Sequence, residues 1–387
     1  MIYFDNAATS FPKPEAVIDA VSAALRHYAA NPGRGSHFLS EKAMEVITEA
    51  REEIAHFFGL YDKNRVFFYQ NATMALNQAI KGFPFKKGDH VITSSYEHNS
   101  IRRPLEAVAR EKDLNITYLS LDTDGHFDEE VWREALQRQT KLIAVTHGSN
   151  LTGMVLPIKE IGQLAIENDI PILLDASQTA GSIPIHMDEM NIDLLAFPGH
   201  KGLLGPQGTG ALLVRKGIEL KPLIHGGTGS LSEEINQPSV LPDKYESGTL
   251  NTAGIAGLLA GIREVKKMTI AKVNQHELEL ASYCYDQLRS INRVRIYGPS
   301  PMKRKLGIIA FEITGNDCQE IATILDLHYG IAVRAGLHCA PLAHDSLGTT
   351  DRGLIRVSFG FQNTIEEIDQ FINAIKEIVQ FYPENNE

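Results

Sequence analysis

Between residues 66 and 214, short apolar runs alternate with segments in which apolar residues recur every three to four positions. The short runs predict buried strands, and the three-to-four spacing predicts amphipathic helices. Regular alternation of the two is typical of a mainly parallel sheet with helices on both faces. Strands are predicted at Val66–Tyr69, Val91–Ser94, Ile116–Leu119, Leu142–His147, Ile172–Asp175, Leu194–Phe197 and Ala211–Val214, and helices at Ala72–Lys81 and Ile101–Lys112.

The chain on either side of this segment has a different pattern. Helical periodicity extends over 15–58, interrupted around Asn31–Gly35, and a long helical stretch covers Thr252–Ser290. Beyond it, strands and helices follow one another without regular alternation, which predicts a smaller α+β domain. Its strands are predicted at Val294–Tyr297, Ile308–Ile313, Ile331–Arg334 and Leu354–Ser358, and its helices near Asp317–His328 and Thr364–Val379.

Length and composition agree with two domains. The chain has 387 residues, of which 43% are hydrophobic, and this is enough for two substantial cores. We expect a large domain over residues 15–255. The N-terminal residues 1–14 and residues 256–387 are expected to form the small domain together.

Charge and special segments exclude several classes of protein. The formal net charge is −11, and acidic and basic residues are interspersed, so we expect no nucleic-acid partner. No apolar run is long enough for a transmembrane helix, and the N-terminus lacks the features of a signal peptide. The three cysteines are too few and scattered for a disulfide framework or a zinc site. These features predict a cytoplasmic protein with neither a membrane segment nor a metal centre.

Two charged residues come at the ends of predicted strands. Asp175 closes the strand Ile172–Asp175, and Lys201 follows Leu194–Phe197. In a parallel sheet, ligands bind beyond the carboxyl ends of the strands, so both side chains are expected at one site. A lysine can form a Schiff base with pyridoxal 5'-phosphate (PLP), and an acid can hold the pyridine nitrogen of that cofactor protonated. The pair therefore predicts a PLP site.

Three motifs carry a family resemblance. The segments Asp175–Gln178, Pro198–Lys201 and Arg334–Ala340 resemble those of cysteine desulfurases in the class V aminotransferase family. The pattern is most similar to the Suf-type or group II enzymes, which include selenocysteine lyases. The resemblance runs from Asp5–Ala8 to the C-terminal helices and implies the PLP-dependent transferase fold of type I, an α/β fold whose large domain has a mainly parallel sheet of the seven-stranded type.

The resemblance implies a role for each residue around the cofactor. Lys201 corresponds to the Schiff-base lysine, Asp175 to the partner of the pyridine nitrogen, and Gln178 to the donor to the phenolic oxygen. His98 corresponds to the histidine that stacks on the ring and assists proton transfer. A helix N-terminus favours a phosphate dianion. The phosphate ligands implied are Ala72, Thr73, His200 and Thr249, the last reaching the phosphate of a partner subunit in a homodimer; Pro198 stands where the family often has serine.

On the substrate side, Cys339 resembles the family's sulfur-accepting nucleophile. It follows a predicted strand and precedes a predicted loop, Ala340–Thr350, and positive charge from Arg334 and His338 would favour its thiolate. Leu337 stands where the family often has a further histidine. Cys284 and Cys318 lie in helical patterns and are predicted to be structural. The substrate contacts implied are Arg356 for the carboxylate, together with Asn150, His37 and Arg334.

The function predicted is that of a PLP-dependent cysteine desulfurase. L-cysteine would become L-alanine, with its sulfur left on Cys339 as a persulfide that passes to an acceptor protein or a small thiol. Selenocysteine lyase activity on L-selenocysteine uses the same residues and stays open. An aminotransferase or a β-eliminating lyase, in which Cys339 would be incidental, is a third alternative.

Overall fold

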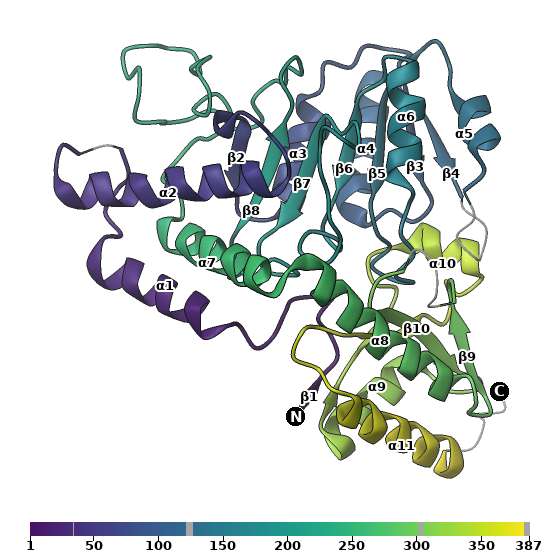
Figure 1. The fold of residues 1–387 in the computed structure, drawn as a ribbon. Coiled ribbons are helices and arrows are strands. Elements are labelled where there is room, and N and C mark those ends of the chain that lie inside the picture. Colours follow the sequence, from purple (N-terminus) through teal and green to yellow (C-terminus); the bar gives the residue numbers. More distant parts are fainter. Residues whose placement is uncertain (34, 121–126, 301–304, 383–387) are drawn as a thin grey trace.

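The computed structural model describes residues 1–387 except 34, 121–126, 301–304 and 383–387. Within the described residues, seven strands form a large sheet in the order β2-β8-β7-β6-β5-β3-β4 (Figure 1). Neighbours from β7 to β4 are parallel, whereas β8 is antiparallel to both β7 and β2. The strands are β2 (Val66–Tyr69), β3 (His90–Ser94), β4 (Asn115–Leu119), β5 (Thr140–Thr146), β6 (Ile172–Asp175), β7 (Leu194–Pro198) and β8 (Gly210–Val214).

Both faces of this sheet are covered, as the sequence pattern predicts. Val91 packs with the helices α3 and α4 on one face, and its neighbour Ile92 packs with α2, α5, α6 and α7 on the other. Successive side chains of a strand point to opposite faces, so an unbroken apolar run belongs between two helical layers. The helices are α2 (Phe38–Phe57), α3 (Ala72–Gly82), α4 (Asn99–Lys112), α5 (Glu129–Ala135), α6 (Ile158–Glu167) and α7 (Thr252–Met268), with a 3₁₀ turn η1 at Lys63–Arg65.

A second sheet carries the C-terminal part of the chain. Its order is β12-β13-β10-β9, all antiparallel, and the helices α8, α9 and α11 pack on it around a separate apolar core. β1 (Ile2–Tyr3) pairs in parallel with β11 (Ile331–Ala332), so the N-terminus lies with this part of the molecule (Figure 1). The other elements are α8 (Ile270–Leu288), β9 (Val294–Tyr297), β10 (Ile308–Ile313), α9 (Cys318–Tyr329), β12 (Arg334–Gly336), α10 (Pro341–Leu347), β13 (Leu354–Ser358) and α11 (Ile365–Phe381).

Three segments differ from the sequence-based expectation. The stretch Thr252–Ser290 is two helices, because Thr269 has a φ of 66° and its side chain caps α8. The predicted strand Ile331–Arg334 is divided between β11 and β12, which belong to different sheets. The predicted loop Ala340–Thr350 contains the helix α10, with Pro341 at its first position, where the missing N–H costs no hydrogen bond.

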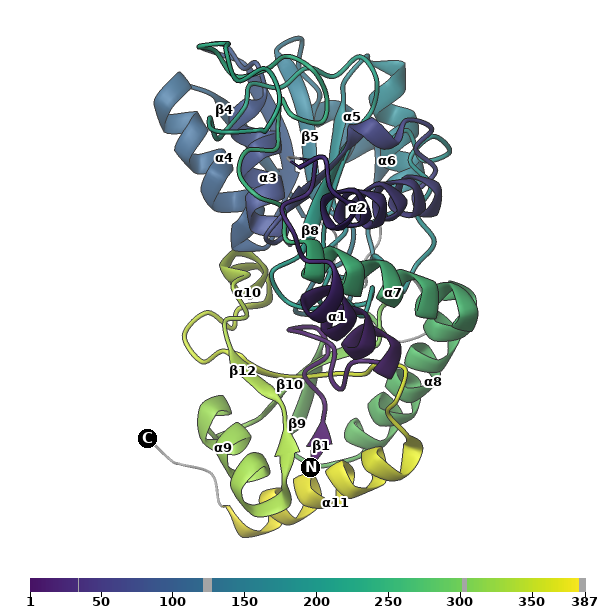
Figure 2. The ribbon, with the colours of Figure 1, turned by 90° about the vertical axis from the view of Figure 1, so that its left-hand side faces the viewer.

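Two helices join the two parts of the molecule. α7 packs against α1 (Glu15–His27) and α2, and it leads directly into α8. α10 lies where the two parts meet, beside the end of β12 (Figure 2). The division between residues 255 and 256 falls within α7, and we keep the two domain ranges as a proposal. Within the described residues, no helix is both long and apolar enough to span a membrane.

Candidate active site

A cavity of about 230 Å³ lies beyond the carboxyl ends of β5, β6 and β7, where the second sheet meets the first. Most of the residues predicted for the site line it together. Cys339, His37 and Thr249 are not among its lining residues. The lining residues that the sequence predicted are Ala72, Thr73, His98, Asn150, Asp175, Gln178, His200, Lys201, Arg334 and Arg356.

Lys201 and Asp175 form the charged centre of this cavity. Asp175 is the last residue of β6 and is 2% exposed; it accepts hydrogen bonds from the amide and the hydroxyl of Ser177. Burial raises the pKa of Asp175, against the opposing effects of Ser177 and Lys201. Burial also lowers the pKa of Lys201 to about 8, and Arg356 acts in the same direction. A neutral amine is therefore accessible near neutral pH, as a lysine nucleophile requires.

The start of α3 faces the same cavity. Asn71 caps the helix through its side chain, which accepts the amide of Met74 at 2.9 Å, and Ala72 and Thr73 occupy the first turn. The first N–H groups of a helix have no intrahelical partner, and the helix dipole adds positive potential there. The Thr73 hydroxyl lies 3.0 Å from that of Ser100. This end of the cavity is suited to a phosphate group.

His98 lines the same cavity as the start of α3 and Lys201. It caps α4 by accepting the amide of Ser100 at Nδ1, 3.1 Å away. Burial, together with the charges of Lys201 and Arg334, lowers the pKa of His98 to about 4. The imidazole is therefore neutral at physiological pH, so it can lie against an electron-poor ring and exchange a proton.

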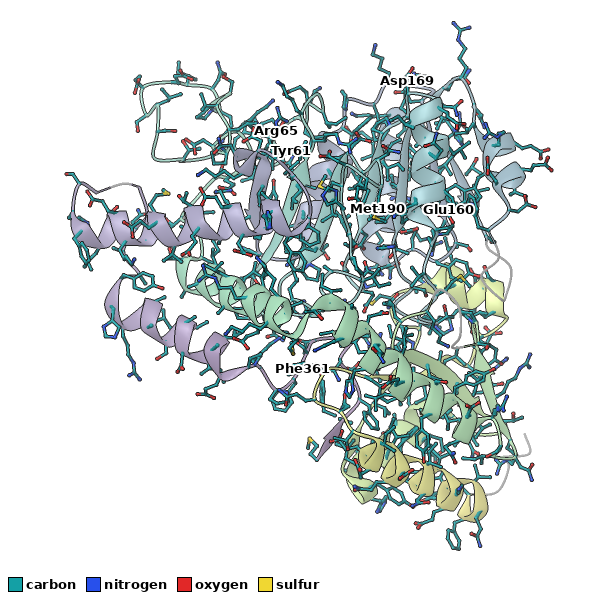
Figure 3. The ribbon with its side chains drawn as sticks, in the orientation of Figure 1. Tyr61, Arg65, Glu160, Asp169, Met190 and Phe361 are labelled. Carbon is teal, nitrogen blue, oxygen red and sulfur yellow. The ribbon has the colours of Figure 1, made fainter. Side chains whose placement is uncertain are left out.

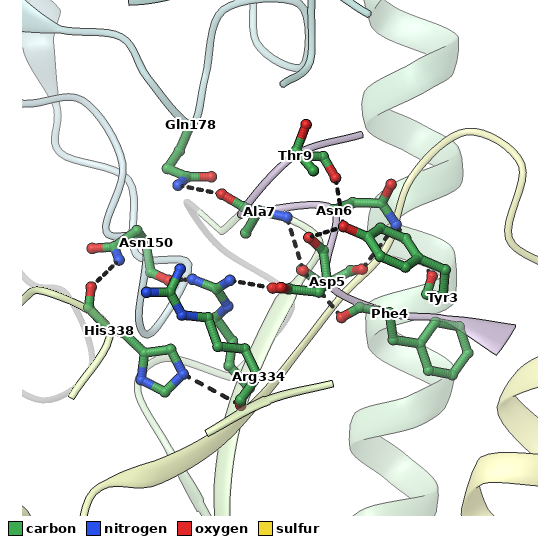
Figure 4. Close-up of polar contacts among 12 residues, drawn as sticks. Tyr3, Phe4, Asp5, Asn6, Ala7, Thr9, Asn150, Gln178, Arg334 and His338 are labelled. Carbon is green, nitrogen blue, oxygen red and sulfur yellow. Dashed lines mark hydrogen bonds and ion pairs between the residues drawn. The ribbon is translucent and has the colours of Figure 1, made fainter. Parts of the chain in front are cut away.

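His200 and Gln178 contact the N-terminal segment that follows β1. The His200 ring lies 3.1 Å from the Thr9 hydroxyl, and burial lowers its pKa to about 4, so the ring is neutral and could offer a phosphate only an uncharged N–H donor. Gln178 Nε2 donates to the Ala7 carbonyl at 3.1 Å (Figure 4). One of the two N–H groups of that amide is thus used within the protein.

Arg356 reaches the cavity from β13 and is only partly satisfied by the protein. Its terminal nitrogens donate to Asp5 Oδ1 at 2.5 Å and to the Asn150 carbonyl at 2.9 Å. The Nε of Arg356 and the Oδ1 of Asn150 are buried and have no hydrogen-bond partner within the described residues. Buried polar atoms without partners are costly, so this donor and this acceptor are explained by a ligand that supplies the missing bonds.

Cys339 is exposed and lies on a turn next to this cavity. Its carbonyl accepts the amide of Asn99 at 2.8 Å, immediately after His98, and the carbonyl of His338 accepts Asn150 Nδ2 at 2.7 Å. The expectation that His338 supplies positive charge to the thiol is wrong. Burial and the charge of Arg356 lower the pKa of His338 to about 2, so its ring is neutral.

The remaining predicted residues lie elsewhere in this chain. His37 is exposed and caps α2 by accepting the amide of Ser40 at 3.3 Å. Thr249 is exposed, in the segment between β8 and α7. Cys284 and Cys318 are buried in α8 and α9. Neither His37 nor Thr249 contributes to the cavity formed by one chain.

A second cavity, of about 50 Å³, lies next to the first and shares Ala7, Gln178 and Lys201 with it. It is mainly apolar, and one wall is formed by Phe361, which Figure 3 labels in the loop between β13 and α11. Glu277 of α8 also lines it, and burial raises the pKa of this carboxyl to about 8. The lysine therefore has a largely apolar space beside it as well as the polar cavity.

Sequence reasoning missed the partners that orient the predicted residues. Asp5 pairs with Arg356 across 351 positions of sequence, and Ser177 donates twice to Asp175. Asp5 lies in Asp5–Ala8, where the family resemblance begins, and no role is predicted for it from the sequence. Ser177 lies inside the motif Asp175–Gln178 and, as a hydroxyl two residues after a buried acid, fits a local hydrogen bond of the kind that such residues often form.

Comparison with known proteins agrees with this geometry. The family model described as aminotransferase class-V matches residues 2–371.

This chain belongs to the class V aminotransferase family.

Its relatives include a probable cysteine desulfurase of Pyrococcus abyssi, 33% identical over 98% of this chain and 94% of the relative. A probable cysteine desulfurase of Methanothermobacter thermautotrophicus is 35% identical over 97% of this chain and 94% of the relative. The apo structure of a cysteine desulfurase from Thermococcus onnurineus matches with a TM-score of 0.93 and 32% identity, covering 98% of this chain and 94% of that one. The predicted family and the predicted type I fold are confirmed.

Proposed function

We propose that this protein is a cysteine desulfurase that converts L-cysteine to L-alanine and keeps the sulfur on Cys339 as a persulfide. The observation that carries the proposal is an exposed thiol beside the lysine cavity. The turn that bears the thiol is hydrogen-bonded to Asn99 and Asn150, which belong to the segments that form the cavity wall. The names of the relatives agree with this activity.

The residues of the cavity fit pyridoxal 5'-phosphate. Within the described residues, only Ser177 donates hydrogen bonds to the buried carboxylate of Asp175. A buried carboxylate is stabilised by a cationic partner such as a protonated ring nitrogen. Lys201 would hold the aldehyde carbon, and the first turn of α3 would hold the phosphate. When bound, the cofactor supplies an electron-withdrawing ring that stabilises negative charge on the substrate Cα.

The substrate would be held by its carboxylate. Arg356 Nε, which is buried and without a partner in the described part of the chain, would donate to one carboxylate oxygen, and Asn150 is placed beside it. Arginine is suited to this role because its planar donors match the two oxygens of a carboxylate. The Lys201 amine, once it no longer holds the aldehyde carbon, would take the proton from Cα and return a proton to the product.

The sulfur step would use the thiolate of Cys339. Its Sγ attacks the substrate sulfur, the bond between that sulfur and the substrate Cβ breaks, and Cβ takes up a proton to give alanine. L-cysteine and one protein thiol thus give L-alanine and one persulfide, with no further oxidant or reductant. The persulfide would pass to an acceptor protein or a small thiol. In a homodimer, Thr249 would contact the phosphate bound to the partner subunit.

The test is a product analysis of the purified protein loaded with the cofactor. With L-cysteine and a reductant, we expect alanine and sulfide in equal amounts and no pyruvate. Borohydride reduction should fix the cofactor on Lys201. Cys339→Ser should still change its absorption on adding L-cysteine, yet release no alanine, because a serine hydroxyl is scarcely ionised at neutral pH. Cys284→Ser is the matched control and should behave as the wild type.

Other products would point to the alternatives. Pyruvate with sulfide from L-cysteine would indicate β-elimination, and transfer of the amino group to a keto acid would indicate an aminotransferase. Selenocysteine lyase activity predicts that L-selenocysteine gives alanine also in Cys339→Ser. Alanine release from L-cysteine by Cys339→Ser at the wild-type rate would contradict the persulfide mechanism.

A further inference from the structure

The turn that carries Cys339 has an unusual backbone. His338 and Cys339 have φ values of 51° and 56°, two consecutive residues in the left-handed region. Residues other than glycine rarely adopt this conformation, and it persists where the surrounding structure imposes it. The direction of the thiol is therefore set by whatever holds these two residues in place.

Hydrogen bonds fix the backbone of the turn from one side. Asn150 Nδ2 donates to the His338 carbonyl at 2.7 Å, and the Asn99 amide donates to the Cys339 carbonyl at 2.8 Å. Both donors belong to the part of the molecule built on the large sheet. They hold the main chain of the turn, but they leave the His338 side chain on its other side to be held by something else.

On that side the His338 ring contacts the Arg334 carbonyl, 3.4 Å from its Nε2, and a second histidine. The ring of His338, 3% exposed, stacks on the ring of His344 from α10 with 6.0 Å between centroids and 7° between planes. His344 is completely buried, and its Nδ1 lies 2.8 Å from the hydroxyl of Thr349, in the turn that ends α10. The stack thus rests on a residue that is itself hydrogen-bonded to the following turn.

The two rings are uncharged in this arrangement. Burial lowers the pKa of both histidines, so stacking brings no two cations together. His338 Nδ1 and His344 Nε2 are buried and lack a hydrogen-bond partner within the described residues. Such atoms are costly in an ordinary core, where an apolar ring would serve as well. This pair of imidazoles includes His338, the residue before Cys339, which carries the exposed one of the three thiols. Two buried, unpartnered nitrogens at this place indicate a role beyond filling space.

We propose that His344 is a positioning residue for the nucleophile: through its ring stack on His338 it holds the Cys339 turn in the left-handed conformation that aims the thiol at the substrate. This inference rests on the proposed function, because it requires Cys339 to accept sulfur. His344 itself touches neither substrate nor cofactor in this account.

The test separates substrate binding from sulfur transfer in the cofactor-loaded protein. Wild type, His344→Ala and His344→Phe are mixed rapidly with L-cysteine, and two events are followed: the absorption change on binding, and persulfide on Cys339 by mass analysis of quenched samples. In His344→Ala the binding change should keep its concentration dependence. The persulfide rate should fall on the order of a hundredfold, the size expected when reacting groups are misplaced by about 1 Å.

His344→Phe keeps a flat ring against His338 but loses the Thr349 hydrogen bond, so its persulfide rate should lie between those of His344→Ala and wild type. Alkylation of Cys339 by iodoacetamide should be unchanged in both variants, because the inference concerns the direction of the thiol. A fall in alkylation that parallels the fall in persulfide rate would overturn the inference, as would a wild-type persulfide rate in His344→Ala.

The matched control is His90→Phe. His90 is also completely buried and bonds Thr140 and Thr117 through its two ring nitrogens, but it begins β3, at the opposite end of the strands. The His90→Phe variant should have a lower thermal stability, but its persulfide rate should not fall relative to its substrate binding. If His344→Ala does not fold, Thr349→Val tests the same contact and should slow persulfide formation alone. Failure of the proposed function looks different: Cys339→Ser would release alanine at the wild-type rate.

Discussion

Within the described residues, two buried arginines pair with carboxylates, and their hydrogen-bonding groups are satisfied to different degrees. Arg51 bonds both oxygens of Glu246 and the Val66 carbonyl, and its guanidinium lies over the ring of Phe68. Glu246 also accepts the Phe68 amide at 2.5 Å. No buried nitrogen of Arg51 lacks a partner within the described residues.

Arg356 has the same chemistry and an open position. It bonds Asp5 and the Asn150 carbonyl, but its buried Nε has no partner in the described part of the chain, and it lines the cavity that holds Lys201. In a closed pair, the hydrogen bonds within the protein offset the cost of removing both charges from water. An open pair keeps an N–H donor that can bind a ligand. Unfilled hydrogen-bonding capacity therefore separates a structural ion pair from a candidate binding residue, which burial and charge alone do not.

The largest effect is expected at the open arginine. Arg356→Met should lower kcat/KM for L-cysteine, because it removes two charge-assisted hydrogen bonds to the carboxylate, one from Nε and one from the remaining N–H of a terminal nitrogen, at about 1.5–3 kcal/mol each. This corresponds to roughly a hundred- to ten-thousandfold. Steady-state kinetics against L-cysteine measures it. An equal activity loss with cysteamine, a substrate analogue without a carboxylate, would show that Arg356 does not act on the carboxylate.

The closed arginine should show the opposite behaviour. Arg51→Met leaves Glu246 buried without its partner, and breaking a buried pair typically costs about 3–5 kcal/mol of stability. Urea unfolding of wild type and variant gives the difference. Below the unfolding transition, kcat/KM for L-cysteine should stay at the wild-type value. A variant that unfolds normally and has lost its activity would break the comparison between the two arginines.

A second substitution should restore part of that loss. Adding Glu246→Gln to Arg51→Met removes the uncompensated charge and keeps an acceptor for the Phe68 amide, so about 1–3 kcal/mol should return. The measurement is again urea unfolding, with Glu246→Gln alone as the control. If the double variant is less stable than Arg51→Met, the unpaired charge of Glu246 is not the cause of the stability lost in Arg51→Met.

The elements of the fold were predictable where one rule governs them. Runs such as Leu142–Val145 are apolar throughout because they lie between two helical layers, and this pattern needs no tertiary information. Interruptions within a predicted element were harder to predict from the sequence. The strand predicted at Ile331–Arg334 is continuous in the sequence pattern, yet its two halves pair with β1 and β13. Contacts with residues distant in sequence determine this pairing. The sequence pattern predicts no helix at α5 or α6, and α10, seven residues long, lies in the segment predicted as a loop.

For the candidate site, residue types and strand ends indicated Lys201 and Asp175, and the family resemblance supplied most of the others. The contacts that orient them were not visible, because Asp5 with Arg356, and Asn150 with His338, join positions that only the folded chain brings together. The charge state of His338 was wrong for a related reason. Proximity in sequence suggested a cation, whereas burial and the neighbouring arginine make the ring neutral.

The smallest effect concerns the electrostatic reach of the two arginines. Lys201 has a pKa lowered to about 8, first by burial and then by Arg356 and Arg334, while Asp175 acts in the opposite direction. Because only the neutral amine attacks an aldehyde, the rate at which apo protein takes up pyridoxal 5'-phosphate should rise with pH through about 8 instead of through the ordinary lysine range. Arg356→Met removes a positive charge, favours the protonated amine and should move the midpoint to higher pH. The shift should be small, since burial is the larger cause and is retained.

Arg51 is not among the groups that act on Lys201, so Arg51→Met should leave the midpoint unchanged. Absorbance followed at a series of pH values gives the rate of cofactor uptake for the wild type and for both variants. A midpoint that moves equally in both variants would show that the pKa of Lys201 responds to overall stability and not to the arginine in its cavity.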